Sequence, residues 1–315
     1  MSDIPFWSLI LLGVVSLILV RVLFLPAAKR VAKTARSRAV LGFISDRERN
    51  GWLFLFAFWS AVVIHPAIAL ILFASSSFLG LREFLTRSPA NGADYKSLFV
   101  SFFILIPCQY LLIGFGWQWF FTVFVPVYAF FLLPSLSALS GDTKEFFARA
   151  AKLQLGMMLA VYGISHIPAA MVLIETKGNN HPAYMMLFLM VTSQVADIVQ
   201  YAVSRRYGKR KIARSVARDL TIEGVAAGAV AAIAAGLSLY WAVPFNWNSN
   251  VGVSVAVALS GFLGHLVLSG IRKSTGIRDW GEAIDGRSSV LDRMASLCFS
   301  APLFYHLSRG ILATN

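Results

Sequence analysis

Long apolar runs constrain this chain more than any other feature of its sequence. An α-helix needs about 20 mostly apolar residues to cross the hydrocarbon core of a bilayer. The chain is 57% hydrophobic and only 14% charged, with a mean hydropathy of +0.69, which is not the profile of a soluble domain. The sequence therefore predicts an all-α polytopic transmembrane helical bundle of about nine spans, at Phe6–Leu25, Trp52–Phe73, Ser97–Gly116, Trp119–Leu139, Leu153–Leu173, Tyr184–Val203, Ile222–Val243, Val251–Ile271 and Met294–Leu312.

The polar connections between these runs are short, which predicts a single integral membrane domain over residues 1–315. The first run has Asp3 before it and no preceding cation, and a basic stretch begins at Pro26. That charge pattern is typical of a retained anchor rather than of a cleaved signal peptide.

The net charge of +13 is concentrated in three polar segments. Residues 26–50 hold seven Lys/Arg, residues 203–219 hold seven, and residues 271–293 hold five. Basic loops of membrane proteins face the cytoplasm, so all three segments are predicted on that side. The last two are separated by two runs and emerge together, which allows one site to be assembled from both.

The first basic segment does not fit this count, because five runs separate it from the second and would place the two on opposite sides. Either one run does not cross fully, or two segments have been merged into one. The candidate is the stretch 52–81, which is interrupted at His65-Pro66.

Several classes of partner and site are disfavoured. The cations flank spans and form no basic groove studded with aromatic residues, which argues against nucleic acid. Cys108 and Cys298 lie inside predicted spans, where they indicate neither a disulfide nor a zinc site. A transporter or channel remains an alternative, although no internal repeat supports it.

Two regions carry candidate chemistry. The segment 269–297 holds five Arg/Lys and four Asp/Glu between two apolar runs, and Asp197 lies inside a predicted span. Charges at such positions are costly and usually functional. Cations can bind phosphates, and carboxylates can bind the metal that accompanies phosphates. The alternative, purely structural interpretation of Asp197 is a salt bridge to Arg205 or to a neighbouring helix.

Both regions resemble the phosphatidate cytidylyltransferases (CDP-diacylglycerol synthases). The C-terminal signature of that family, S-x-x-K-R-x-x-G-x-K-D-x-G followed by P-G-H-G-G-x-x-D-R-x-D-S, is matched without a gap at Ser269, Arg272, Lys273, Gly276, Arg278, Asp279, Gly281, Gly286, Asp292, Arg293 and Ser296. An upstream A-D-x-x-A-Y-x-x-G-K-x-x-G-K-x-K-x-A stretch is matched at Ala196, Asp197, Tyr201, Gly208, Lys209, Lys211 and Ala213, with Thr221 and Gly224 beyond it. The resemblance assigns residues 196–297 to the catalytic part and residues 1–195 to N-terminal spans.

The resemblance implies an enzyme that joins CTP to phosphatidate and releases pyrophosphate, in a reaction that depends on Mg²⁺, with one or two ions. Asp279 and Asp292 would be catalytic, and both would bind the metal together with Asp197. The substrate-binding residues would be Lys209, Lys211, Thr221, Arg272, Lys273, Arg278 and Arg293. The partners would be CTP, phosphatidate and membrane lipids at the cytoplasmic face of the cell inner membrane, with monomer or homodimer left open.

Three departures from the family pattern bear on activity. Leu220 replaces a lysine, Arg287 replaces a histidine, and Ala295 replaces the last acid of D-R-x-D. A catalytically inactive or repurposed paralogue that binds lipid or nucleotide is therefore the alternative function. A CDP-alcohol phosphotransferase is disfavoured, because beyond Asp285-Gly286 the rest of its motif is absent.

Overall fold

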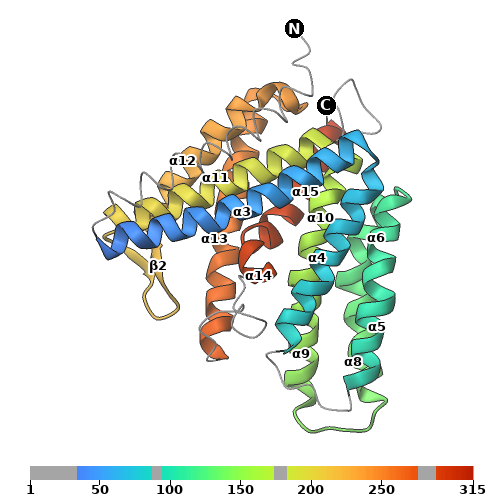
Figure 1. Cartoon of the computed structure of the whole chain (residues 1–315). Coiled ribbons are helices and arrows are strands. Elements are labelled where there is room, and N and C mark those ends of the chain that lie inside the picture. The colour runs from blue at the N-terminus through green and yellow to red at the C-terminus, as the bar shows by residue number, and fades with distance from the viewer. Residues whose placement is uncertain (1–33, 87–93, 174–182, 276–288, 315) are drawn as a thin grey trace.

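The computed structural model describes residues 34–86, 94–173, 183–275 and 289–314, and the described chain is almost entirely helical (Figure 1). The α-helices are α3 (Ala35–Val63), α4 (Pro66–Thr86), α5 (Tyr95–Val100), α6 (Ile106–Gly114), α7 (Gln118–Val123), α8 (Phe130–Ala138), α9 (Phe146–Gly156), α10 (Ile164–Ala169), α11 (Ala183–Tyr207), α12 (Ile222–Ser238), α13 (Trp247–Ser274), α14 (Val290–Arg293) and α15 (Leu297–Thr314). Segments of π-helix continue three of them, at η3 (Ser101–Leu105), η4 (Phe124–Ala129) and η5 (Met157–Gly163), and short 3₁₀ segments follow at η6 (Ala170–Leu173) and η7 (Tyr240–Ala242). The short antiparallel strands β1 (Lys211–Ala213) and β2 (Ala217–Thr221) form a hairpin.

The predicted fold class is confirmed. Among the described residues, six helical segments are long and apolar enough to cross a membrane, and α12 is a shorter apolar helix. The six are Pro66–Thr86, Tyr95–Gly114, Gln118–Ala138, Phe146–Leu173, Ala183–Tyr207 and Trp247–Ser274. The predicted run Phe6–Leu25 lies outside the described residues.

The prediction of one span over Trp52–Phe73 is wrong. α3 ends at Val63 and α4 begins at Pro66. Proline has no backbone N–H and is therefore well suited to the first position of a helix, and His65 Nδ1 accepts the backbone N–H of Ala67 at 3.2 Å across the break. Two helices were thus merged in the predicted run.

The packing of α3 bears on the conflict over the first two basic segments. α3 and α11 lie side by side and antiparallel, since Phe43 stacks on Tyr201 with ring centroids 4.1 Å apart and Phe58 on Tyr184 at 6.4 Å. The start of α3 therefore lies beside the basic end of α11, as the charge pattern requires.

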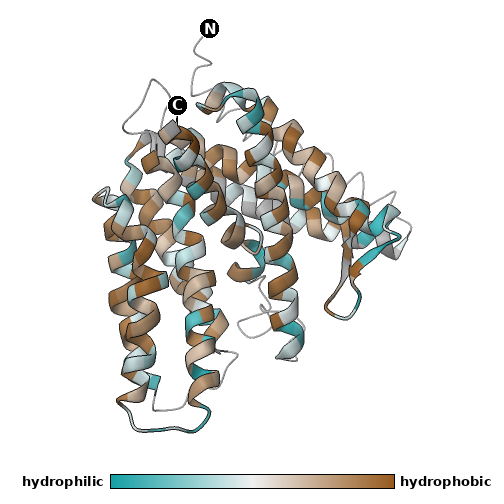
Figure 2. Cartoon of the chain, turned by 180° about the vertical axis from the view of Figure 1, so that it is seen from behind, coloured by the Kyte–Doolittle hydropathy of each residue, from teal (hydrophilic) through white to brown (hydrophobic). Residues whose placement is uncertain are grey.

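Small residues let α11, α12 and α13 approach closely. A Cβ atom added at Gly224 of α12 would lie 1.8 Å from Ser204 Oγ of α11, and one added at Gly236 would lie 2.1 Å from Ser254 Oγ of α13. Close packing of this kind is typical of helices in lipid. Figure 2 shows hydrophilic residues at the β1–β2 hairpin and at the connection between α8 and α9, with hydrophobic residues along the helices between.

Candidate functional site

Asp197 is a buried carboxylate with partners on α13 and on the turn that precedes α15 (Leu297–Thr314). It lies on α11 and is only 3% exposed. Ser296 Oγ donates a hydrogen bond to Asp197 Oδ2 at 2.5 Å, and His265 Nε2 of α13 lies 3.2 Å from the same oxygen. Ser193 Oγ in turn donates to Ser296 Oγ at 3.2 Å. The structural interpretation of Asp197 anticipated a partner on a neighbouring helix, and that partner is His265.

Two glycines of α13 allow this arrangement. A Cβ at Gly264 would lie 2.3 Å from the carbonyl oxygen of Ala295, and one at Gly261 would lie 3.1 Å from Ser296 Cβ. The turn that carries Ala295 and Ser296 can therefore rest directly on the backbone of α13, where Ser296 reaches Asp197.

Asp292 pairs with a residue on the same face of α13 as His265, nearer the C-terminal end of that helix. It lies on α14, a single turn between α13 and α4 (Figure 1). Arg272 Nη1 of α13 lies 3.1 Å from Asp292 Oδ1, and both side chains are 28% exposed. His265 and Arg272 are seven residues apart, which is two helical turns and about 10 Å along the axis. One face of α13 thus carries partners of two of the three predicted metal-binding carboxylates, Asp197 and Asp292.

Glu83 at the end of α4 joins this region, although the sequence did not single it out. Its carboxylate accepts hydrogen bonds from Ser289 Oγ at 2.5 Å, from Val290 N at 3.1 Å and from Leu291 N at 3.2 Å. An adjacent Arg-Glu pair in an otherwise apolar helix was the available signal.

The predicted substrate-binding residues of the hairpin region have mixed surroundings. Lys209 and Lys211 are exposed. Glu223 accepts the backbone N–H groups of Lys209 and Arg210, each at 3.2 Å, which ties the hairpin to the first turn of α12. Thr221 is 2% exposed and caps α12, because its Oγ1 accepts the N–H of Gly224 at 3.1 Å and donates to Ser204 Oγ at 3.1 Å.

The remaining predicted residues divide between the described and undescribed parts of the chain. Arg272 Nη2 donates to Ser269 Oγ at 3.2 Å in addition to facing Asp292. Lys273 Nζ donates to the carbonyl oxygen of Ser215, at the tip of the hairpin. Arg293 is half-buried beside Asp292. Arg278 and Asp279, as well as Arg287, lie outside the described residues.

The carboxylates are compatible with a magnesium ion of the kind that accompanies nucleotides. Within the described residues, no group of three or more His, Cys, Asp or Glu side chains could hold a metal ion by itself. Mg²⁺ needs no such cage, because it keeps several waters and is usually bound through one or two carboxylates plus the phosphates of a substrate. Asp197 and Asp292 are oxygen donors of the required type.

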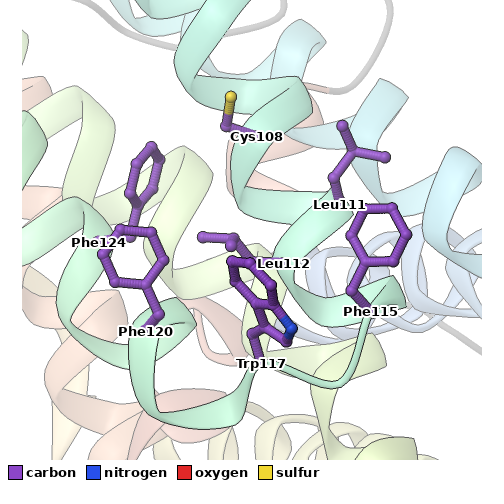
Figure 3. A pocket seen from close by; sticks show the side chains of 7 residues that line it. All are labelled: Cys108, Leu111, Leu112, Phe115, Trp117, Phe120 and Phe124. Carbon is purple, nitrogen blue, oxygen red and sulfur yellow. The ribbon is translucent and has the colours of Figure 1, made fainter.

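The structure also contains an apolar pocket of about 400 Å³ away from this site (Figure 3). It lies where α6 turns into α7 and is lined by Cys108, Leu111, Leu112, Phe115, Trp117, Phe120 and Phe124. None of these residues is charged. A triphosphate requires cations or N–H donors, so this pocket is not the nucleotide site.

Comparisons with known proteins identify the family of this chain. The model of the "Cytidylyltransferase family" matches residues 45–310. The chain is 30% identical over 270 residues to the uncharacterized protein YnbB of Escherichia coli (strain K12), covering 85% of this chain and 88% of that protein. It is also 30% identical over 175 residues to a phosphatidate cytidylyltransferase of Staphylococcus aureus (strain COL), and 29% identical over 176 residues to that of Staphylococcus saprophyticus, in each case covering 55% of this chain and 64% of the relative. The chain belongs to the cytidylyltransferase family, and is thus a multi-pass membrane protein of the nucleotidyltransferase class.

Proposed function

We propose that this protein is a CTP:phosphatidate cytidylyltransferase, which makes CDP-diacylglycerol and pyrophosphate at the cytoplasmic face of the inner membrane. The carrying observation is that one face of α13 aligns the partners of Asp197 and Asp292, in a chain of the cytidylyltransferase family. Relatives named phosphatidate cytidylyltransferase support the choice of substrate.

The reaction joins two phosphates. An oxygen of the phosphatidate phosphate attacks the α-phosphorus of CTP, a new P–O bond forms, and the bond to the β-phosphate breaks so that pyrophosphate leaves. Such transfers depend on positioning and on cations that stabilise the negative charge of the transition state. A lipid substrate with two acyl chains requires a site at the membrane surface, where the chains can remain in the bilayer.

Asp197, Asp279 and Asp292 would hold one or two Mg²⁺ ions, which when bound would neutralise phosphate charge. The protein's own residues have distinct tasks. Ser296 and His265 orient the carboxylate of Asp197 through contacts of 2.5 Å and 3.2 Å. Arg272 orients Asp292, and either can exchange its partner for a phosphate or a cation, because both are partly exposed.

The basic residues would bind the phosphates of CTP and phosphatidate. Lys209 and Lys211 are exposed on the hairpin, and Lys273 holds the hairpin tip through the carbonyl of Ser215. The hairpin therefore lies next to the end of α13 that carries Arg272. Arg278 and Arg293 complete the proposed set, and Thr221 supports it by capping α12.

An inactive or repurposed paralogue is the second candidate, favoured by two specific positions. Ala295 is 2% exposed and its carbonyl rests against Gly264, so this position is used for packing. Leu220 is 8% exposed and is likewise buried. Neither can supply the charge that the family places there.

Product analysis separates the two candidates. Purified protein in mixed micelles would receive labelled CTP, phosphatidate and Mg²⁺, with GTP and diacylglycerol as substitute substrates in parallel reactions. We expect CDP-diacylglycerol only when CTP and phosphatidate are both present. A folded sample that binds phosphatidate but forms no liponucleotide with Mg²⁺ or Mn²⁺ would favour the paralogue.

A further inference from the structure

The contact between Glu83 and the turn that carries Asp292 links parts of the chain that are far apart in sequence. Glu83 is 206 residues from Ser289, yet its Oε2 accepts a hydrogen bond from the hydroxyl group of that serine, with 2.5 Å between the two oxygens. The backbone N–H groups of Val290 and Leu291 donate to the two oxygens of the same carboxylate, at 3.1 Å and 3.2 Å. Both oxygens of Glu83 are therefore engaged by the start of α14.

The turn needs such support. α14 spans only Val290–Arg293, and a helix of this length is not stable in isolation. Its first N–H groups have no partner within the helix, and a carboxylate both accepts their hydrogen bonds and complements their partial positive charge. Ser289 Oγ adds a cap by accepting the N–H of Leu291 at 3.1 Å.

Packing reinforces the hydrogen bonds. Leu291 is fully buried, and its Cδ2 would lie 3.5 Å from a Cβ atom added at Gly80, one turn before Glu83 on α4. α4 thus holds α14 through an apolar contact as well as through the carboxylate.

We infer that Glu83 is a positioning residue for Asp292: it fixes the α14 turn so that the Asp292 carboxylate faces Arg272 on α13. The inference rests on the proposed function, in which Asp292 contacts the metal. It brings the N-terminal spans into a site whose sequence motifs lie entirely within residues 196–297. Glu83 acts through the turn and does not itself contact the substrate.

A double-mutant cycle tests this role. Glu83→Gln keeps the size of the side chain but removes its charge and one acceptor, and we expect kcat/KM to fall about 10- to 100-fold, as for residues that orient metal ligands. In the Asp292→Asn background the same substitution should cost less than about threefold, because residues that act through one another are not additive. Equal losses in both backgrounds would overturn the inference.

Further variants separate positioning from general damage. Glu145→Gln makes the same chemical change at an exposed position before α9 and should leave activity unchanged. Ser289→Ala removes one bond to Glu83 and the cap on the Leu291 N–H, but leaves both backbone bonds to Glu83. Its loss should also shrink in the Asp292→Asn background, and an equal loss in both backgrounds would contradict the positioning role of the turn.

Amide hydrogen exchange provides a readout that does not depend on turnover. We expect faster exchange at Val290 and Leu291 in Glu83→Gln than in the parent chain, with no change in Glu145→Gln. Unchanged exchange would refute the positioning role even in an active enzyme. Absence of turnover in the parent chain, with altered exchange in Glu83→Gln, would refute the proposed function while retaining the role of Glu83 in holding the turn.

Discussion

Asp197 and Asp292 contact the two ends of one face of α13, and they are held in different ways. The Asp197 side chain is 2% exposed and contacts a hydroxyl and a histidine, whereas the Asp292 side chain is 28% exposed and faces an arginine. The buried carboxylate is held by contacts from α13 and from the turn that carries Ser296, and it has little access to water. The exposed one lies on a single turn and can meet a phosphate or a hydrated cation. One helix face can thus hold a fixed carboxylate at one end and an adaptable one at the other.

Removing the charge of the buried carboxylate should have the largest effect. Asp197→Asn retains the shape of the side chain but loses the charge, and we expect turnover to fall about 10³-fold, the upper end for one electrostatic group in an active site. Ser296→Ala keeps the carboxylate and removes one hydrogen bond, so its loss should be smaller. Steady-state kinetics with CTP as the varied substrate would measure both. Near-normal turnover of Asp197→Asn would show that the buried carboxylate is not needed for the reaction.

Substitution of Asp292, the partly exposed carboxylate, should reduce turnover less than substitution of Asp197. Its pairing with Arg272 should be more sensitive to salt than the contacts of Asp197. We expect Asp292→Asn to reduce turnover about 10²-fold. Arg272→Ala leaves Asp292 in place, and because exposed ion pairs contribute only about 0–1 kcal/mol, the unfolding midpoint should barely change. Salt screens exposed charges more than buried ones. Activity of the parent chain should therefore fall with ionic strength, and that of Arg272→Ala should be less salt-dependent. Identical salt dependence of the two would contradict the distinction.

The contact of α13 with the Ala295–Ser296 turn can be tested with two glycines of the same helix. Gly264→Ala places a Cβ against the carbonyl oxygen of Ala295, so we expect a loss of about 1–3 kcal/mol in unfolding free energy from overpacking. Gly252 has no neighbouring atom within 4 Å of its added Cβ, and Gly252→Ala should stabilise the helix by about 0.5–1 kcal/mol. Thermal unfolding in detergent compares the pair. Equal midpoints would show that the turn does not rest on α13.

The cap of α12 should give the smallest effect. Thr221→Ala removes the acceptor for the Gly224 N–H, and the loss of a threonine cap costs about 1 kcal/mol. Thr221→Ser keeps the hydroxyl and should unfold at nearly the temperature of the parent chain. A loss of turnover in Thr221→Ser without a change in unfolding temperature would instead assign Thr221 a direct role toward substrate.

Much of the fold was accessible from the sequence, because membrane spans are encoded locally. The run Tyr184–Val203 corresponds to α11 at Ala183–Tyr207, and Ser97–Gly116 to the helical segment Tyr95–Gly114. The error over Trp52–Phe73 came from counting apolar residues across Pro66, whose missing N–H favours the start of a new helix. The proline therefore marks the helix boundary in the sequence, whereas the hydropathy of the run does not.

The site was accessible only in part. Motif spacing singled out Asp197, Asp292 and Arg272, and the structure places Arg272 and the histidine partner of Asp197 on one face of α13. No motif includes His265, because its pairing with Asp197 depends on how α11 and α13 pack. Glu83 meets α14 across 206 residues, and such a contact leaves no trace in local spacing. The motifs therefore identified the acidic residues, whereas their partners follow from tertiary packing and could not be predicted from the sequence.

The most direct measurement of the central claim is kcat/KM for CDP-diacylglycerol formation in Asp197→Asn and Asp292→Asn, with Glu145→Gln as the carboxylate control. The account predicts liponucleotide formation by the parent chain and by the control, a loss of about 10³-fold in the first variant and of about 10²-fold in the second. Equal activity of all four proteins, or no liponucleotide from a well-folded parent chain, would contradict the assignment of the α13 face as the reaction site.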